Sequence, residues 1–371
     1  MPAKSSPKTQ SVSRKHRYAV LMAGGAGTRF WPWSRADLPK QLLPLAGSDS
    51  MLAETVARLR GIIPRENILV VTGKRLRRGV ERALPELPRE SIFCEPEGRN
   101  TTACVGWGAL EVAKRDPEGV MIVLPADHVV SPLGAFRAAV LDAITLADRL
   151  HYLVTFGIKP AAPETGYGYI RAGRALAEGE GALRVEAFHE KPSAARARRF
   201  LRHGRYYWNS GMFAWRADVI LQEIKNHVPQ IAAGLEEIAA ARKGRRASQR
   251  VVDRVYPVLH SISVDHAVLE KSDRVAMFVA PFQWSDIGSW DAVAAVWPRD
   301  RDGNSSRDPI VAVASKNNVV ASRGKPVALL GVEDLAVVDS GDAILVCKRE
   351  RAQDVRAIVA ALAAAGLGTL R

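Results

Sequence analysis

The first half of the chain alternates short, unbroken apolar runs with segments of helical periodicity. The apolar runs have the length of β-strands and lie at residues 18–22, 67–72, 91–94 and 119–124. Between them, apolar positions recur at helical spacing around residues 51–61, 74–84 and 101–114. Because such strands are apolar on both faces, they are typical of a parallel sheet covered by helices on each side. The pattern predicts an α/β fold whose ligands bind beyond the carboxyl ends of the strands.

The rest of the chain continues this pattern and then changes character. Further strands are predicted at 152–158, 183–189, 211–215 and 275–279, with helices near 193–202, 217–226 and 248–256. Around residues 301–306 the sequence becomes polar and helix-breaking, which indicates a domain boundary. Beyond it lie short β-rich runs at 310–314, 318–322, 326–330, 335–339 and 343–347, and then an alanine-rich helix over about 352–364. We therefore predict a sheet domain over 17–300 and a small β-rich C-terminal domain over 305–371.

Composition narrows the class of protein. A hydrophobic content of 47 % with 25 % charged residues is ordinary for a globular protein of 371 residues. No apolar run approaches the roughly 20 residues of a membrane span, so no membrane association is expected. Residues 1–16 are rich in Ser, Lys and Arg and lack an apolar core, which indicates a disordered basic tail rather than a secretory signal. The three cysteines form no C-x-x-C pair, and so sparse a set favours a reducing, cytoplasmic location.

The net charge of +14 raises the question of a nucleic-acid partner. The arginines are scattered over several segments, and the sequence contains no zinc-finger or helix-turn-helix pattern. A solvated basic surface that attracts polyanionic nucleotides explains the charge more simply. We therefore expect no nucleic-acid partner.

The strongest chemical signal is a glycine-rich turn directly after the first apolar run. Residues 18–29 read Tyr-Ala-Val-Leu-Met-Ala-Gly-Gly-Ala-Gly-Thr-Arg, so the strand leads into a turn that contains Gly24, Gly25, Gly27, Thr28 and Arg29. Glycines let backbone N–H groups converge on phosphate oxygens, and an arginine can bind phosphate through two hydrogen bonds. With Arg35 and Lys40 close behind, the segment predicts a triphosphate cradle.

Two other kinds of glycine loop are excluded. The dinucleotide fingerprint would need a third glycine where Phe30 stands, and the Walker loop would need Ser or Thr where Arg75 follows Lys74. An ordinary strand–helix turn is the alternative for the glycines alone. It does not account for Thr28-Arg29 or for the Pro39-Lys40-Gln41 that follows.

Two aspartates are candidate metal ligands. Asp127, in Leu-Pro-Ala-Asp-His, follows a buried strand, where a helix N-cap is the alternative role. Asp286 lies between Trp284 and Trp290, where a turn or cap aspartate is the alternative. Mg²⁺ typically takes one or two carboxylates together with substrate oxygens. The glycine turn and Asp127 both follow strands, so they should emerge at the same edge of the sheet.

Further residues are candidates for binding a sugar phosphate and a base. The sugar-phosphate candidates are Gly168, Glu190, Lys191 and Asn209. A glycine permits close approach, a carboxylate accepts from hydroxyls, and a lysine can bind a phosphate. A solvated lysine and a structural turn are the alternatives for Lys191 and Asn209. The base candidates lie in Glu95-Pro-Glu-Gly-Arg99-Asn100-Thr101, which follows a strand and opens a helix, and helix N-termini favour anions.

In this order the motifs resemble the sugar-1-phosphate nucleotidyltransferases, from about Tyr18 to about Leu362. The resemblance implies a Rossmann-like, GT-A-like fold with a mixed, mostly parallel sheet. It also implies a small C-terminal domain, often a partial left-handed β-helix used in self-association, so a homodimer through that domain is expected. In similar enzymes the aspartates that match Asp127 and Asp286 hold the catalytic Mg²⁺. The Glu-Pro-x-x-Arg-Asn-Thr pattern occurs in the guanylyl branch, which favours GTP over UTP or dTTP.

The implied reaction is transfer of GMP from GTP to α-D-mannose 1-phosphate, which gives GDP-mannose and pyrophosphate. Since the attacking phosphate is already an anion, the reaction needs positioned cations rather than a general base. The expected catalytic residues are Arg29, Lys40, Asp127 and Lys191. The nucleotide is expected to lie against Gly24, Gly25, Gly27, Thr28, Glu95, Arg99, Asn100 and Thr101.

Three positions depart from the family's pattern: His266 stands where tyrosine is usual, His189 where an aliphatic residue is common, and Thr102 where alanine is usual. These departures bear on fine specificity. The alternatives are a related enzyme for a manno-heptose or fucose 1-phosphate, one that uses another nucleoside triphosphate, and a catalytically silent GDP-sugar-sensing subunit. A second, isomerase domain is not expected, because only about 65 residues follow Ser306.

Overall fold

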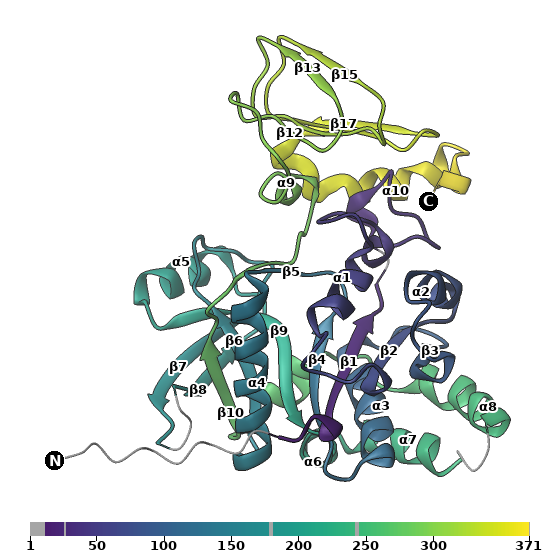
Figure 1. Cartoon of the computed structure of the whole chain (residues 1–371), viewed down its shortest axis with the longest axis vertical. Coiled ribbons are helices and arrows are strands. Elements are labelled where there is room, and N and C mark those ends of the chain that lie inside the picture. Colours follow the sequence, from purple (N-terminus) through teal and green to yellow (C-terminus); the bar gives the residue numbers. More distant parts are fainter. Residues whose placement is uncertain (1–11, 26, 178–180, 242–244, 371) are drawn as a thin grey trace.

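The computed structural model describes residues 12–25, 27–177, 181–241 and 245–370. Figure 1 shows a large lobe built on one sheet and a smaller lobe that contains the last strands of the chain. The mixed, mostly parallel α/β fold with a β-rich C-terminal domain is therefore confirmed.

The large lobe is built on a nine-stranded sheet in the order β3-β2-β1-β4-β9-β6-β10-β8-β7. Strands β1 to β4 pair in parallel, and so do β6 and β10, whereas β9 runs antiparallel between β4 and β6. The strands are β1 (Arg17–Ala23), β2 (Ile68–Gly73), β3 (Ile92–Glu95), β4 (Val120–Pro125), β6 (Leu153–Ile158), β7 (Tyr169–Ala175), β8 (Leu183–His189), β9 (Tyr206–Arg216) and β10 (Val275–Val279).

Helices cover both faces of this sheet because successive strand residues point to opposite sides. In β1, Val20 packs into a core that contains residues of α3, α6, α7 and α8, whereas Leu21 packs into a core with residues of α1, α2 and α4. Both residues are fully buried, and each contributes about 2 kcal/mol of apolar burial. These helices are α1 (Met51–Arg58), α2 (Arg77–Ala83), α3 (Asn100–Arg115), α4 (Leu133–Leu150), α6 (Ala217–His227), α7 (Pro229–Ala240) and α8 (Arg245–Val255).

Several elements were absent from the sequence-based prediction. Two long helices, α4 and α7, were not predicted, and neither was β7. A ribbon of two three-residue strands, β5 (Val129–Ser131) and β11 (Gln283–Ser285), was also missed. This ribbon determines where Asp127 and Asp286, which flank it, lie relative to each other.

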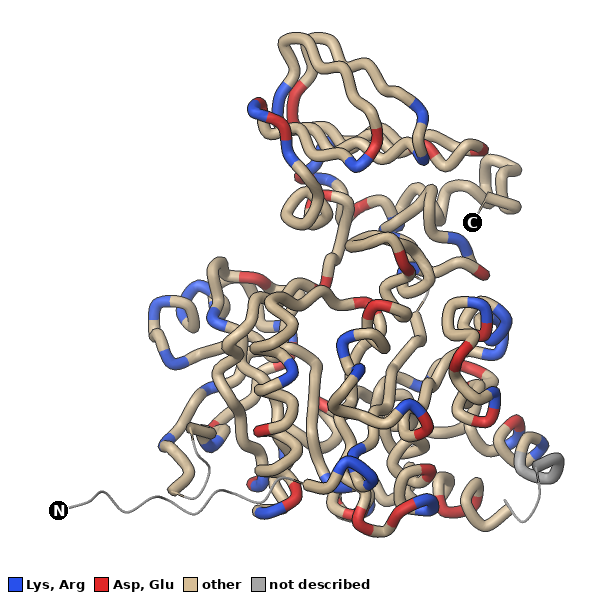
Figure 2. The backbone as a smooth tube through the Cα atoms, in the orientation of Figure 1, with Lys and Arg blue, Asp and Glu red and all other residues tan. Residues whose placement is uncertain are grey.

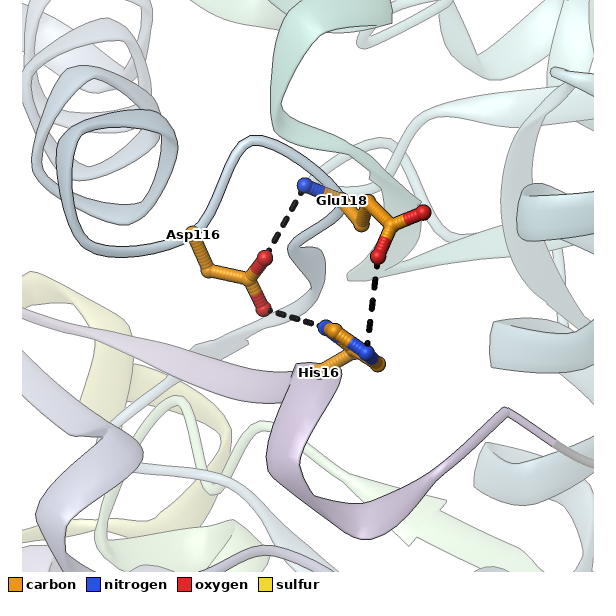
Figure 3. A group of neighbouring side chains, drawn as sticks. All are labelled: His16, Asp116 and Glu118. Carbon is orange, nitrogen blue, oxygen red and sulfur yellow. Dashed lines mark hydrogen bonds and ion pairs between the residues drawn. The ribbon is translucent and has the colours of Figure 1, made fainter.

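The start of the described chain is docked against the sheet. Arg17 Nε donates to the Val12 carbonyl at 2.7 Å, and His16 Nδ1 lies 2.7 Å from Asp116 Oδ2 (Figure 3). Residues 12–16, which the sequence analysis assigned to a disordered tail, are therefore part of the fold, because these contacts hold them to the turn after α3. Residues 1–11 lie outside the described residues.

The small lobe is a coil of parallel strands. Strands β12 (Ser305–Ser306), β14 (Val319–Ala321) and β16 (Leu335–Asp339) pair in parallel on one side, and β13 (Ile310–Val313) pairs with β15 (Val327–Leu330) on another. Inside the coil, Asn318 Nδ2 donates to Asn304 Oδ1 at 2.9 Å, and Asn304 Nδ2 donates to the Ser315 carbonyl at 3.0 Å. Antiparallel β17 (Ile344–Lys348) and helix α10 (Val355–Ala364) follow.

A third hydrophobic core joins the two lobes. It combines Phe30, Trp31 and Trp33 from the loop after β1 with Ile287 and Trp290 from the loop after β11, and with C-terminal residues such as Val319, Ala336 and Val355. Helix α9 (Trp290–Val293), which precedes the predicted boundary, belongs to this core. Hydrogen bonds from indoles cross it, including Trp290 Nε1 to the Trp31 carbonyl at 3.0 Å.

Charge is distributed over both lobes. Figure 2 shows Lys and Arg interspersed with Asp and Glu along many elements, with a concentration of arginine on α5 (Ala194–His203). Within the described chain, no helix is both long and apolar enough to span a bilayer.

Candidate active site

The glycine turn lies at the carboxyl edge of the sheet, directly after β1, as predicted. Gly27 has φ +56°, and a Cβ there would lie 2.6 Å from the Lys40 backbone nitrogen, so only glycine fits without strain. Gln41 Nε2 donates to the Ala23 carbonyl at 2.9 Å and approaches those of Gly24 and Gly25 at 3.4 Å. Gln41 therefore holds the glycine turn in place. The sequence analysis gave this residue no role.

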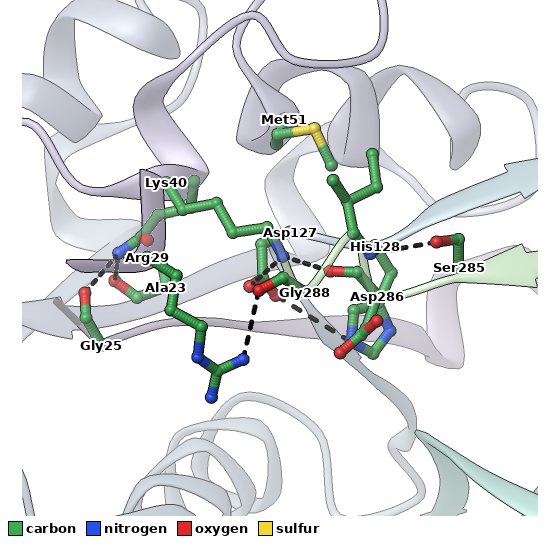
Figure 4. Close-up of polar contacts among 12 residues, drawn as sticks. Ala23, Gly25, Arg29, Lys40, Met51, Asp127, His128, Ser285, Asp286 and Gly288 are labelled. Carbon is green, nitrogen blue, oxygen red and sulfur yellow. Dashed lines mark hydrogen bonds and ion pairs between the residues drawn. The ribbon is translucent and has the colours of Figure 1, made fainter. Parts of the chain in front are cut away.

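The β5–β11 ribbon brings the two predicted metal aspartates to the same place. Asp127 lies two residues before β5, and Asp286 directly follows β11. In the ribbon, Ser285 pairs with Val129 and Trp284 with Val130, so the ends that carry the aspartates are adjacent. Figure 4 shows both aspartates beside the side chain of Lys40.

Lys40 links these two loops through its ammonium group. Lys40 Nζ donates to Asp127 Oδ2 at 2.9 Å and also to the Asp286 carbonyl. The Lys40 side chain is only 8 % exposed, whereas that of Asp127 is 35 % exposed and so remains accessible. Burial alone would raise the pKa of the Asp127 carboxyl, but Lys40 and His128 outweigh it, so the pKa lies below its usual value. Asp127 is ionised at neutral pH.

Aromatic residues fix the Asp286 carboxylate. The Tyr167 hydroxyl donates to Asp286 Oδ1 at 2.8 Å, and the Tyr167 ring packs edge-on against Trp208 and Trp284. Burial and the charge of Asp286 raise the pKa of Tyr167 far above its usual value, so the hydroxyl keeps the proton that it donates. Tyr167 directly precedes Gly168, which is the only residue of this segment that the sequence analysis named.

His128 also contacts Trp284, and its imidazole ring is neutral at pH 7. Burial lowers its pKa to about 4, and its Nδ1 accepts from Trp284 Nε1 at 3.1 Å. Its Nε2 therefore carries the proton and lies 4.0 Å from Asp127 Oδ1.

Arg29 is exposed and lies beside the loop that carries Asp286. Its Nη1 donates to the Gly288 carbonyl at 3.2 Å, two residues after Asp286. Phe30 and Ile287, the residues that follow Arg29 and Asp286, are both buried in the core that joins the lobes. That core therefore holds the two loops in one relative position.

A second group of polar residues gathers around Gly168. A Cβ on Gly168 would lie 2.5 Å from Glu190 Oε2, so Glu190 approaches the backbone closely there. Lys191 has φ +43°, its side chain is 67 % exposed, and its Nζ lies 3.5 Å from Glu190 Oε1. The lysine is thus held at the surface of the site by an unusual backbone conformation.

Asn209, in β9, is bonded to Gly168 and to a residue that sequence reasoning missed. Its backbone N–H donates to the Gly168 carbonyl at 2.8 Å, and its Nδ2 donates to Asp265 Oδ1 at 2.9 Å. The sequence analysis named only its neighbour His266, as a departure from the family's pattern. An aspartate ahead of a short apolar run is a weak signal by itself.

The base candidates lie at the start of α3. Glu95 ends β3, accepts from the Tyr256 hydroxyl at 2.5 Å, and has its other oxygen next to Gly24. Burial raises the pKa of Glu95. Arg99 Nη2 donates to Glu97 at 3.1 Å, Asn100 has φ +61°, and Thr101 Oγ1 accepts from the Val264 N–H at 2.9 Å. The predicted nucleotide residues thus lie at one edge of the sheet, and the hydrogen bonds among the described residues there form separate groups.

The described residues contain one compact group of three metal-type side chains, His16, Asp116 and Glu118. It lies at the opposite edge of the sheet, where residues 14–16 lead into β1 (Figure 3). At the catalytic edge, two carboxylates from adjacent loops, one ionised and accessible, fit a hard divalent cation.

Comparisons with known proteins agree with this arrangement. A family model described as nucleotidyl transferase matches residues 18–302, and one described as MannoseP isomerase/GMP-like beta-helix domain matches residues 308–362. A crystal structure described as mannose-1-phosphate geranyltransferase from Thermus thermophilus is 34 % identical with a TM-score of 0.84, over 94 % of this chain and 99 % of that chain.

Curated relatives cover most of this chain and about three-quarters of their own length. The xanthan biosynthesis protein XanB of Xanthomonas campestris pv. campestris is 38 % identical over 349 residues, which are 94 % of this chain and 73 % of the relative. The mannose-1-phosphate guanylyltransferase of Escherichia coli K12 is 38 % identical over 361 residues, 96 % of this chain and 75 % of the relative. The mannose-1-phosphate guanylyltransferase of Klebsiella pneumoniae is 40 % identical over 343 residues, which are 92 % of this chain and 72 % of the relative. Members of the matched family generally use a divalent metal ion. With its sheet, its glycine turn and its paired aspartates, this chain belongs to the nucleotidyl transferase family and is an enzyme of that class.

Proposed function

We propose that the protein transfers GMP from GTP to α-D-mannose 1-phosphate, with release of pyrophosphate and formation of GDP-mannose. The names of the curated relatives support this substrate pair. The observation that carries the proposal is the meeting of Arg29, Lys40, Asp127 and Asp286 at the edge that Gly24 and Gly25 also line.

The reaction is an in-line displacement at the α-phosphorus of GTP. An oxygen of the sugar phosphate forms the new P–O bond, and the bond between the α- and β-phosphates breaks to release pyrophosphate. The nucleophile is an anion, so its repulsion from the triphosphate is the main obstacle. Arg29, exposed beside the glycine turn, neutralises the triphosphate, and Lys40 holds the Asp127 and Asp286 loops in register.

Asp127 and Asp286 would hold a divalent ion, which we propose is Mg²⁺. When bound, the ion would neutralise charge on the phosphate oxygens. Asp127 is already ionised in the presence of Lys40, and Tyr167 orients one oxygen of Asp286. The chain thus presents two fixed carboxylates before any ligand arrives.

We call Arg29, Lys40, Asp127 and Asp286 the phosphate end of the site. We call Gly168, Glu190, Asn209 and Asp265 the sugar end. Lys191, exposed beside Glu190, would bind the phosphate of the sugar, and Glu190 would accept from its hydroxyls. The two ends are contiguous, because Tyr167 contacts Asp286 and is followed by Gly168. Gly24, Gly25, Gly27 and Thr28 would bind the triphosphate, and Glu95, Arg99, Asn100 and Thr101 would receive the base.

We also propose a cytoplasmic homodimer that associates through the small lobe. Val311 and Val313 on β13 and Leu330 on β15 are exposed apolar side chains, and Val313 pairs with Leu330. Such neighbouring exposed side chains support an interface between protein chains. The cysteines Cys94, Cys104 and Cys347 are free, which supports a reducing compartment. Light scattering on the purified chain tests the dimer.

Release of pyrophosphate tests the activity. The full chain with Mg²⁺ and GTP should release pyrophosphate only when mannose 1-phosphate is added. A panel of sugar 1-phosphates against the four nucleoside triphosphates then tests the specificity. Equal turnover with UTP or dTTP would contradict the assignment of the base, and no pyrophosphate from any pair would contradict the enzymatic proposal.

A further inference from the structure

The segment from Ile262 to Glu270 connects the base side of the site to the sugar end. On the base side it is anchored to the start of α3: the Val264 N–H donates to Thr101 Oγ1 at 2.9 Å, and Thr102 Oγ1 donates to the Ile262 carbonyl at 2.8 Å. Val264 and residues 267–269 are buried in the core beneath the sheet. The segment therefore has a fixed position.

Asp265 begins a π-helical turn, Asp265–Leu269, at the sugar end of this segment. Single π-helical turns are rare and frequently occur at functional sites. Asp265 Oδ1 accepts from Asn209 Nδ2 at 2.9 Å, while Asn209 Oδ1 accepts from Thr155 Oγ1 at 3.0 Å and from the Gly211 N–H at 3.3 Å. The amide of Asn209 is therefore held on both of its faces, and Asp265 alone holds the nitrogen face among the described residues.

Asp265 occupies an electrostatically unfavourable place. Burial, and then the negative charge of Glu190, raise the pKa of Asp265 to about 7. The other titratable groups around it are His266 on the same turn, Glu270 directly after that turn, and Lys191 next to Glu190. The repulsion between these two carboxylates destabilises the protein without a ligand, which is a common feature of binding sites.

We propose that Asp265 is a positioning residue for the sugar 1-phosphate, which acts by fixing the Asn209 amide beside Glu190. The inference rests on the proposed function, because it assigns a role within the same site. It predicts that loss of Asp265 weakens binding of the sugar 1-phosphate and leaves the nucleotide side intact.

Steady-state kinetics of full-length variants test this role. In Asp265→Ala, the KM for the sugar 1-phosphate should rise about tenfold, since one charge-assisted hydrogen bond is lost. The KM for GTP should stay within about twofold and kcat within about threefold. Asp218→Ala is the matched control, because it also removes a hydrogen-bonded carboxylate: Asp218 accepts from Arg216 Nε at 3.0 Å at the start of α6, away from the residues of the site. Its kinetics should equal those of the wild type.

Asp265→Asn separates positioning from simple support of the fold. Asparagine keeps an oxygen that can accept from Asn209, so the KM for the sugar 1-phosphate should recover to within about threefold of the wild type at pH 7. In the wild type this KM should rise as pH falls from 8 to 6, because Asp265 becomes protonated, and the rise should be smaller in Asp265→Asn. Protonation of the sugar phosphate affects both proteins equally.

Thermal unfolding provides a second measurement, in which Asp265→Asn should improve the stability of the protein although it weakens sugar binding. The pKa of Asp265 is higher in the folded protein than its usual value, so this group lowers stability progressively as pH rises from about 4 through 7. Asp265→Asn should therefore raise Tm at pH 8 by a few degrees while it weakens sugar binding at that pH. A residue that only supports the fold would lower Tm instead.

The inference is overturned if Asp265→Ala changes kcat and both KM values in parallel, or if the KM for the sugar 1-phosphate does not change. The test is read on whichever sugar 1-phosphate the wild type turns over. Failure of mannose 1-phosphate as substrate therefore contradicts the proposed function without deciding the role of Asp265.

Discussion

The phosphate end and the sugar end of the site differ in how the charges of their carboxylates are compensated. At the phosphate end, Lys40 lies between the Asp127 carboxylate and the Asp286 carbonyl, and the pKa of Asp127 is lowered. At the sugar end, burial and the negative charge of Glu190 raise the pKa of Asp265 to about 7. The first end is balanced before substrate arrives, whereas the second holds like charges together.

This difference matches what each end must bind. Phosphates and metal ions are charged, so their site needs fixed charges of both signs, already compensated, that do not have to reorganise. Sugar hydroxyls are neutral donors, and the Glu190 carboxylate beside the Asn209 amide can offer them acceptors. The comparison predicts that variants at the phosphate end lower kcat, whereas variants at the sugar end raise the KM for the sugar 1-phosphate.

Arg29→Ala should have the largest effect. Removal of a preorganised cation from the transferring group should lower kcat by a factor of about 100 to 1000. Its Tm should change by less than about 2 °C, because Arg29 is exposed and its hydrogen bond is to the Gly288 carbonyl. Arg60→Ala, which removes an exposed arginine paired with Glu86, is the matched control. Turnover of Arg29→Ala within threefold of the wild type would remove this arginine from the chemistry.

Gly27→Ala should damage both the fold and the turnover. The left-handed φ costs about 1–2 kcal/mol for a residue with a Cβ, and the new Cβ would overlap the Lys40 backbone, which cannot rotate away. We expect the free energy of unfolding to fall by about 2–4 kcal/mol and kcat to fall at least tenfold. Urea denaturation and pyrophosphate release measure the two effects. Gly61→Ala, at φ +88° with no atom within 4 Å of the new Cβ, isolates the cost of the backbone conformation.

Gly168→Ala is the corresponding change at the sugar end, and it should affect binding alone. Its Cβ would lie 2.5 Å from Glu190 Oε2, but this is the end of a flexible side chain that can turn aside. We therefore expect the KM for the sugar 1-phosphate to rise about tenfold, with kcat and Tm nearly unchanged. A fall in kcat with an unchanged KM would contradict the division between the two ends.

Tyr167→Phe probes the junction of the two ends. It removes the hydrogen bond to Asp286 and keeps the ring between Trp208 and Trp284. We expect kcat to fall about three- to tenfold, since Asp286 would lose its orientation. Tyr152→Phe, outside the site, should behave as the wild type in the same assay. An effect confined to the KM for the sugar 1-phosphate would assign Tyr167 to the other end.

His16→Ala should have the smallest effect, because His16 lies at the edge of the sheet opposite both ends. Loss of its contacts with Asp116 and Glu118 should lower the free energy of unfolding by about 1 kcal/mol. All kinetic constants should remain within about 1.5-fold of the wild type. A larger kinetic change would show that the two edges of the sheet are coupled.

Much of the fold could be predicted because the buried strands carry their own signal. The strands from β1 to β4 are apolar on both faces, and the glycine turn and Asp127 follow two of them, so their common edge was predictable. The five β-rich runs after residue 306 likewise correspond to β13 through β17.

The features that sequence could not show arise from long-range pairing. Strands β5 and β11 are three residues each and far apart in sequence, so nothing local predicts that Ser285 pairs with Val129. Asp286 could be proposed from its motif, but its place beside Asp127 depends on that ribbon. The role of Asp265 depends on Asn209 and Glu190, which come from other elements, so its raised pKa has no sequence signature.

The aromatic core between the lobes has a consequence for how such an enzyme could be divided. Phe30 and Ile287, next to Arg29 and Asp286, pack with Trp290 and with C-terminal residues that include Val319 and Ala336. A fragment that ends before residue 305 would therefore lack part of the core that fixes the loop of Arg29 relative to the loop of Asp286. The lobes are distinct in outline, yet recombination between homologues could exchange one without the other only where the tryptophan contacts remained compatible.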